Sequence, residues 1–307
     1  MEKLTDTQLI KRINELKKKK NAILLVHNYQ LPEIQDIADF TGDSLELSRK
    51  AAKTNADVII FCGVHFMAET AAIICPEKLV LMPDPNAGCP MANMITAAGL
   101  RALKKEHPKA TVVGYVNTPA DVKAECDVCC TSTNAVWITD SLKDAPEIIF
   151  VPDKYLATYV ASKTHKTLIP WNGYCPTHVR ILTQDILKQK KLHPKAEVMV
   201  HPECTPDVTA LADVVLSTSK MCEHAKVTKA NELIVGTEIG LLHRLHKDSP
   251  NKKFYPASDM ATCPNMKKNT LEKVLVSLEN MKHEVKVPGD IRIKARRAID
   301  RMLAATV

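Results

Sequence analysis

Three of the four cysteines that precede a proline recur at an even interval, and they are the residues of this 307-residue chain best suited to metal chemistry. They are Cys89, Cys175 and Cys263, and successive members lie 86 and 88 residues apart. So regular an interval predicts a threefold internal repeat that contributes one thiolate per copy. Three thiolates that meet at a pseudo-threefold axis leave one corner of a four-iron cluster, or of a tetrahedral metal ion, open for a substrate. The spacing therefore outlines a catalytic metal site.

The repeat is also visible away from these cysteines. The sequence HPKA at 107–110 recurs unchanged at 193–196. When the three copies are aligned, Asp39, Asp127 and Asp213 fall on the same position. A period of about 86 residues is too long for the unit of a solenoid and long enough for a small α/β domain.

The order of elements within each copy predicts the fold class. Each copy reads as strand, helix, strand, helix, strand, cysteine loop and helix, and short β-branched runs at 22–26, 112–116 and 197–200 are typical of strands. Continuous apolar runs, such as the one at 57–61, predict parallel strands buried on both faces. We therefore predict an α/β protein of three pseudo-threefold-related, three-layer α/β/α sandwich domains with parallel sheets and an active site at the central axis.

The predicted domain boundaries follow the repeat. The first copy spans 1–107, the second 108–193 and the third 194–269. The helical segment at 270–307 is expected to pack on the first copy, because its first helix occupies the same place in the period as the N-terminal helix at 6–19. Such packing would close the three copies into a ring.

Composition narrows the class of protein. No apolar run approaches the roughly 18 residues that cross a membrane, and the N-terminus lacks a basic-then-apolar signal pattern. Ten cysteines without a short disulfide framework indicate a reduced, cytoplasmic chain. The net charge of +7 is modest, and no nucleic-acid motif or aromatic platform accompanies the basic segments. We expect neither a membrane nor a nucleic acid as a partner.

Polar side chains occur at the end of the first predicted strand in every copy. The equivalent positions hold His27, Tyr115 and His201 and, two residues later, Tyr29, Asn117 and Glu203. Residues two apart on a strand face the same side, and ligands of open α/β sheets bind beyond the carboxyl ends of the strands. The pattern predicts one shared polar site. The alternative is a polar rim that only faces solvent.

Hydroxyl side chains precede a helical pattern at another repeated position, which holds Ser44, Ser132 and Thr218. A hydroxyl at a helix start can cap the helix, and the helix start itself can bind a phosphate or carboxylate. Three helix starts directed at one cavity would bind a multiply anionic ligand.

A second group of cysteines, Cys126, Cys129 and Cys130, looks by itself like a metal or redox motif. In the aligned copies, these positions correspond to small or apolar residues. That correspondence favours packing in the core over metal binding. A redox role for the group remains open.

These residues belong to strings that resemble the quinolinate synthase A family of NAD biosynthesis from end to end. The strings are VHNYQ at 26–30, GDS at 42–44, GCPMA at 88–92, GYVNT at 114–118, WNGYCPTH at 171–178, HPEC at 201–204 and TEIG at 237–240.

The resemblance implies three α/β/α domains around a pseudo-threefold axis and one 4Fe-4S cluster per chain, held by Cys89, Cys175 and Cys263. It implies that iminoaspartate and dihydroxyacetone phosphate condense to quinolinate, phosphate and water, with the cluster as Lewis acid. Iminoaspartate is short-lived, so a transient contact with the enzyme that produces it is a further expectation, although no motif marks that contact.

The resemblance also implies roles for individual residues. The catalytic residues would be Tyr29, His201 and Glu203, which would share the proton transfers. The substrate-binding residues would be His27, Ser44, Tyr115, Asn117, Ser132, His178, Ser217 and Thr218.

Two other classes of function are alternatives at this stage. One is another iron–sulfur hydro-lyase, or a zinc enzyme, on the same tripled scaffold, because the number of thiolates alone does not separate zinc from iron–sulfur. The other is a non-catalytic iron–sulfur sensor. A sensor would not need convergent Tyr, Asn and Glu side chains.

Overall fold

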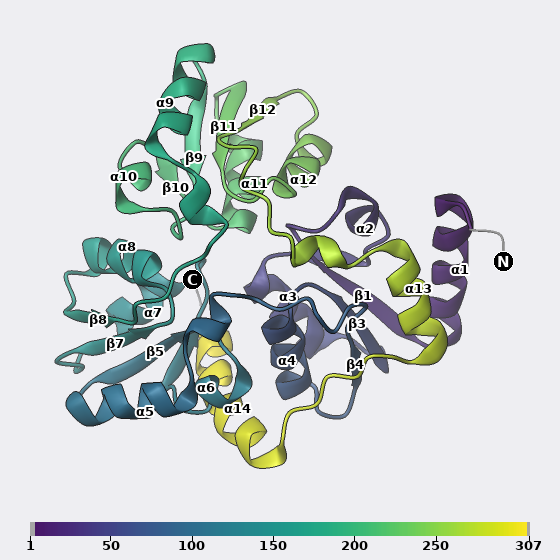
Figure 1. The fold of residues 1–307 in the computed structure, drawn as a ribbon, viewed down its shortest axis with the longest axis horizontal. Helices are drawn as coiled ribbons and strands as arrows, with labels where there is room; N and C mark the ends of the chain where they lie inside the picture. The colour runs from purple at the N-terminus through teal and green to yellow at the C-terminus, as the bar shows by residue number, and fades with distance from the viewer. Residues whose placement is uncertain (1–3, 306–307) are drawn as a thin grey trace.

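The computed structural model describes residues 4–305 and contains three sheets of four parallel strands each. The strand orders are β2-β1-β3-β4, β6-β5-β7-β8 and β10-β9-β11-β12, so one topology recurs three times. Figure 1 shows the three sheets and their helices grouped around a common centre. The predicted α/β class with three layered units is confirmed. We refer to the three sheets with their helices as the first, second and third units.

The strands are short, and the central ones are buried on both faces, as parallel strands covered by helices must be. In the part of the chain that the structure describes, they are β1 (Ala22–His27), β2 (Phe40–Gly42), β3 (Val58–Cys62), β4 (Leu79–Leu81), β5 (Thr111–Tyr115), β6 (Val128–Cys130), β7 (Ile148–Val151), β8 (Leu168–Pro170), β9 (Glu197–Val200), β10 (Val214–Val215), β11 (Glu232–Gly236) and β12 (Lys253–Pro256).

The sequence order predicts three strands per unit, and the structure adds a fourth at one edge of each sheet: β2, β6 and β10. These strands have only two or three residues, too few to show a periodicity of side chains. The repeated aspartate fixes each one, because its backbone and its carboxylate both pair with the central strand. The Oδ2 atoms of Asp39, Asp127 and Asp213 accept the backbone N–H of Leu24, Val112 and Val198 at 2.7, 2.8 and 2.7 Å.

The helices between the strands cover both faces of the sheets and carry the expected caps. Thr5, for example, forms a capping box with Gln8 at the start of α1. Among residues 4–305 the helices are α1 (Asp6–Lys19), α2 (Pro32–Asp36), α3 (Ser44–Lys53), α4 (His65–Ile74), α5 (Ala97–Glu106), α6 (Ala120–Lys123), α7 (Ala135–Ser141), α8 (Lys154–Thr164), α9 (Thr183–Leu192), α10 (Pro206–Thr209), α11 (Thr218–Val227), α12 (Leu241–Asp248), α13 (Leu271–Asn280) and α14 (Gly289–Ala304), with the 3-10 turns η1 (Ala92–Met94), η2 (His178–Arg180) and η3 (Met266–Lys268).

The two C-terminal helices pack on different units. Helix α13 lies against α1 and β3 of the first unit, as expected from its place in the period. Helix α14 lies against α6 and β6 of the second unit as well as α4 of the first (Figure 1). The C-terminal segment thus joins two units rather than covering the first alone. None of the helices within residues 4–305 has the length and apolar character that crossing a bilayer requires.

Candidate active site

A cavity of about 210 Å³ lies where the carboxyl ends of the three sheets converge. The strand-end residues and the three cysteine loops reach it from all three units, which is the arrangement predicted from the repeat. The predicted residues that line it are His27, Tyr29, Ser44, Cys89, Tyr115, Asn117, Ser132, Cys175, His178, His201, Glu203, Thr218 and Cys263. Ser217 does not line it, because its hydroxyl is buried next to Thr133 at 2.8 Å.

The two strand-end histidines have the same local geometry and the same tautomer. The Nδ1 atom of His27 accepts the backbone N–H of Tyr29 at 3.2 Å, and that of His201 accepts the backbone N–H of Glu203 at 3.3 Å. A backbone N–H can only donate, so Nε2 carries the ring proton in both residues. Burial lowers the pKa of each histidine to about 3, which keeps both rings neutral. His201 Nε2 lies 3.2 Å from the hydroxyl of Ser132.

Glu203 is the central acceptor of the site. Its Oε1 atom accepts the phenol proton of Tyr115 at 2.5 Å, and its Oε2 atom lies 2.8 Å from His178 Nδ1. Burial by itself would raise the pKa of Glu203, but the charge and hydrogen bond of His178 outweigh it and hold this pKa below its usual range. Burial and the neighbouring Glu203 raise the pKa of the Tyr115 phenol, which therefore stays a hydrogen-bond donor.

A chain of hydrogen bonds connects Glu203 with Tyr29. From Glu203 it runs to His178 Nδ1, and His178 Nε2 lies 2.9 Å from the hydroxyl of Thr237. The Thr237 hydroxyl in turn lies 2.6 Å from the Tyr29 phenol. Burial and Glu203 raise the pKa of Tyr29 as well, so this phenol stays protonated. The chain can transfer a proton between the first and third units without solvent.

The three cysteine loops share one local geometry. Each cysteine begins a turn that leads into η1, η2 or η3, and its Sγ accepts the backbone N–H groups two and three residues later. Burial raises the pKa of all three thiols, that of Cys89 to about 12, and these N–H groups oppose the increase. Paired N–H donors stabilise the negative charge of metal-bound thiolates, and charge and hydrogen bonds at the sulfur also tune iron–sulfur clusters. The donor set therefore fits the cluster that the family resemblance implies.

A second set of potential ligands overlaps this one. The donor atoms of Cys175, His178 and Glu203 lie within 4.8 Å of one another, close enough to bind a single metal ion such as zinc. However, His178 and Glu203 already bond to each other and to Thr237 and Tyr115. Binding a single ion would break these contacts. Of the three repeated cysteines, Cys175 has its Sγ 3.2 Å from His178 Nδ1, so a cluster would have to displace only this one side-chain contact of His178.

The helix starts near the cavity differ from the expectation of three equivalent anion sites. At α3, the Oδ1 atom of Asp43 already accepts the N–H groups of Leu45 and Glu46, so the protein supplies its own carboxylate there. The starts of α7 and α11 have no side-chain cap. Helix α7 begins only at Ala135, three residues after Ser132, and the N–H of Ala135 already bonds to the carbonyl of Thr131. An anionic substrate group therefore has the start of α11 available, beside Thr218, and the hydroxyl of Ser132 in the turn before α7.

Sequence reasoning missed several residues that line the cavity. Asp43 and Thr131 directly precede the predicted residues Ser44 and Ser132, and this proximity was the only sign in the sequence that they could line the cavity. Arg180 had no signal, since it reaches the cavity only through the η2 turn. Within residues 4–305 it is the only lysine or arginine that lines the cavity, and its guanidinium has no protein partner there. Apolar side chains complete the wall: Val64, Phe66, Met67, Met91 and Met266.

The other group of cysteines lies away from the cavity. Cys129 and Cys130 are completely buried in β6, and Cys126 Sγ donates to the carbonyl of Val122 at 3.2 Å. Gly114 of β5 is required beside them, because a Cβ there would approach the sulfur of Cys126 to 2.5 Å. These contacts agree with packing in the core.

Three α/β/α units that surround a cavity of buried ionisable groups define an enzyme. A model of the quinolinate synthetase A protein family matches residues 11–304, and the chain belongs to this family. It is 56% identical to quinolinate synthase 1 of Methanosarcina acetivorans over 304 residues, which cover 99% of this chain and all of the relative. It is 59% identical to quinolinate synthase of Dehalococcoides mccartyi strain CBDB1 over 292 residues, which cover 95% of this chain and 96% of the relative.

Proposed function

We propose that this enzyme condenses iminoaspartate with dihydroxyacetone phosphate to form quinolinate, phosphate and two molecules of water. The atoms of the two substrates balance those of the products, so the reaction needs no oxidant. The observation that carries the proposal is the convergence of three equivalent cysteines and a hydrogen-bonded Glu203 on one cavity. We place the reaction in the cytoplasm, because the ten cysteines are free thiols and a reducing compartment keeps them so.

The proposed cofactor is one 4Fe-4S cluster per chain, held by Cys89, Cys175 and Cys263. When bound, it would supply one iron without a protein ligand, which can act as a Lewis acid toward a substrate oxygen. The N–H pairs of the three turns support this assignment, since each would donate to a bound thiolate.

The protein's own groups would bind and orient the two anionic substrates. Iminoaspartate carries two carboxylates and dihydroxyacetone phosphate one phosphate. The uncapped start of α11, beside Thr218, and the hydroxyl of Ser132 are suited to these anions. The Nε2–H groups of His27 and His201 add neutral donors, and Arg180 adds the one permanent positive charge among the described residues that line the cavity.

Proton transfers would centre on Glu203 and Tyr29. Ring formation requires that protons leave carbon and that hydroxyl groups leave as water, so the site needs both an acceptor and a donor. The Glu203 carboxylate can accept a proton, and the Tyr29 phenol can donate one to a departing oxygen. The chain through His178 and Thr237 can then return a proton to Tyr29 from the Glu203 side.

The test of this function is product formation. The full chain is reconstituted anaerobically with iron and sulfide, and it receives dihydroxyacetone phosphate together with iminoaspartate generated in the assay. We expect quinolinate and phosphate in equal amounts. A chain that is loaded with iron and releases neither product would contradict the proposal. Activity with zinc alone would instead support a zinc enzyme at Cys175, His178 and Glu203.

A further inference from the structure

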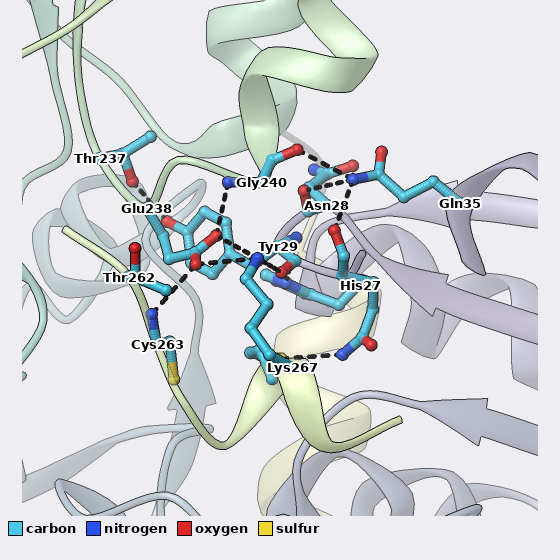
Figure 2. A network of polar contacts seen from close by, with 12 residues as sticks. His27, Asn28, Tyr29, Gln35, Thr237, Glu238, Gly240, Thr262, Cys263 and Lys267 are labelled. Atoms are coloured by element: carbon cyan, nitrogen blue, oxygen red, sulfur yellow. Dashed lines mark hydrogen bonds and ion pairs between the residues drawn. The ribbon is translucent and has the colours of Figure 1, made fainter. Parts of the chain in front are cut away.

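A buried ion pair lies at the edge of the cavity, at the junction of the third and first units, and only its acidic member lines the cavity. Glu238 follows β11 and its side chain is completely buried, and Lys267 lies in η3. Lys267 Nζ is 2.9 Å from Glu238 Oε1 and 3.1 Å from Oε2. Figure 2 shows this pair between the loop of Cys263 and the segment of Tyr29.

Both members of the pair bind the backbone of proposed site residues. Glu238 Oε1 accepts the N–H of Cys263 at 3.0 Å, and Oε2 accepts the N–H of Gly240 at 2.7 Å. Lys267 donates to the carbonyl of Tyr29 at 2.5 Å. The pair therefore links the backbone of a proposed cluster ligand with the backbone of a proposed catalytic tyrosine.

This arrangement occurs in only one of the three described units. The position two residues after the third strand holds Val64, Asp153 and Glu238 in the three units. Asp153 caps α8 through the N–H groups of Tyr155 and Leu156 instead of reaching a cysteine loop.

The position four residues after the cysteine likewise differs among the units. It holds Asn93, Val179 and Lys267. The ion pair is therefore an addition to the repeat rather than a part of its shared architecture.

The junction that the pair occupies joins units that are distant in the chain. There, Asn28 Nδ2 donates to Thr218 Oγ1 at 2.8 Å, and Gln35 Nε2 donates to the carbonyl of Gly240 at 2.9 Å. A charged pair in such a place is costly unless its hydrogen bonds are satisfied. Both oxygens of Glu238 have two partners each, which meets this requirement.

We propose that Glu238 and Lys267 are positioning residues that fix the Cys263 loop relative to Tyr29. Neither residue ligates metal or transfers a proton in this scheme. Glu238 orients the backbone from which the Cys263 thiol projects, and Lys267 holds the Tyr29 carbonyl at the same point. The inference rests on the proposed function, because it assigns Cys263 and Tyr29 to that site.

The experiment measures the reactivity of Cys263 in the full-length chain. The chain is stripped of iron with a chelator, reduced and treated with iodoacetamide, and mass spectrometry follows the alkylation of each cysteine. Cys89 and Cys175 line the same cavity and serve as internal references. In Lys267→Met we expect Cys263 alone to react faster, by about tenfold, because losing charged hydrogen bonds frees its loop.

The matched control is Lys17→Met. Lys17 Nζ also pairs with a carboxylate, Asp39 Oδ1 at 2.8 Å, and donates to a carbonyl, that of Ile37 at 3.3 Å. Asp39 also accepts a strand N–H, but this pair lies outside the cavity. Lys17→Met should lower the melting temperature and leave the ratio of Cys263 to Cys89 alkylation unchanged.

Two further variants keep the inference testable if Lys267→Met does not fold. Glu238→Gln removes the charge with little change of shape and should also accelerate Cys263 alone. Lys267→Arg keeps the charge and should return the alkylation ratio to within about twofold of the wild type. An unchanged ratio in Glu238→Gln and Lys267→Met would overturn the inference. Because this readout requires no turnover, it is independent of the product assay.

Discussion

The phenol of Tyr115 donates a hydrogen bond to Glu203 across 2.5 Å, and the two residues come from different units. Tyr115 ends β5 of the second unit, and Glu203 follows β9 of the third. On its other oxygen, Glu203 bonds to His178. A carboxylate held on both oxygens is oriented before any substrate arrives, which is what a general base requires.

Glu203→Gln should therefore separate chemistry from assembly. Glutamine keeps the size of the side chain and an oxygen that can accept from Tyr115, but it cannot take up a proton. We expect turnover to fall roughly 10²–10⁴-fold, the usual contribution of a general acid–base group, with iron content unchanged. Steady-state kinetics and iron analysis on the same preparation measure both quantities. Turnover equal to the wild type would remove Glu203 from the proton transfers.

Thr237→Val tests the hydrogen-bond chain between His178 and Tyr29. Valine has the shape of threonine but lacks the hydroxyl that contacts both residues. We expect kcat to fall about tenfold, with little change in KM. The path through the Thr237 hydroxyl is lost, the direct contact between the Tyr29 phenol and His178 Nε2 is long at 3.4 Å, and the anion sites are intact.

The control for this variant is Thr139→Val in α7. Thr139 is completely buried, and its hydroxyl has no hydrogen-bond partner among residues 4–305. This substitution should leave kcat unchanged. If kcat changes equally in both valine variants, the chain of hydrogen bonds through Thr237 has no catalytic role.

Arg180→Ala tests electrostatic recognition at the cavity. Arg180 is its only permanent cation in the described part of the chain, whereas Asp43, Glu203 and Glu238 are acidic. We expect KM for dihydroxyacetone phosphate to rise about tenfold, with a small change in kcat, and Arg180→Lys to recover most of the loss. Arg297→Ala, an exposed arginine of α14, is the matched control. Equal effects of the two alanine variants would contradict this role.

The strand ends and the cysteines of the cavity could be predicted because equivalent residues occur in all three copies of the internal repeat. Equivalent positions of parallel strands meet at one edge, so the repeat alone brings His27, Tyr115 and His201 together. The contacts between units could not be predicted. His178 reaches both Glu203 and Thr237 only because the η2 turn directs it there, and no local pattern encodes that turn.

The three edge strands show a different limit. Strands β2, β6 and β10 are too short to have a pattern of their own, and each depends on a hydrogen bond between an aspartate and the neighbouring strand. The repeated aspartates were visible in the sequence, but their partners were not. Similarly, Gly42-Asp43-Ser44 indicated a helix start without showing that Asp43 would occupy it.

The carboxylate of Asp84 should contribute to the free energy of unfolding in a way that depends on pH. Burial would raise its pKa, but the hydrogen bond from Lys273 at 2.6 Å, the N–H of Asn86 and the charge of Lys273 lower it overall. A carboxyl whose pKa is lower in the folded state stabilises the fold above its unfolded pKa and loses that effect as pH falls through the folded pKa. Urea unfolding across acidic pH should thus show a smaller loss of stability in Asp84→Asn than in the wild type. Parallel curves for the two proteins would contradict this.

The central claim, that Cys89, Cys175 and Cys263 hold an iron–sulfur cluster, is tested most directly by metal and sulfide content. After anaerobic reconstitution, the wild type and Cys129→Ala should each bind about four irons and four sulfides per chain. Cys175→Ala should lose the cluster and its visible charge-transfer absorption, and it should form no quinolinate. Cys129 is the matched control, because it is buried in β6 away from the cavity. Full iron content in Cys175→Ala, or its loss in Cys129→Ala, would contradict the account.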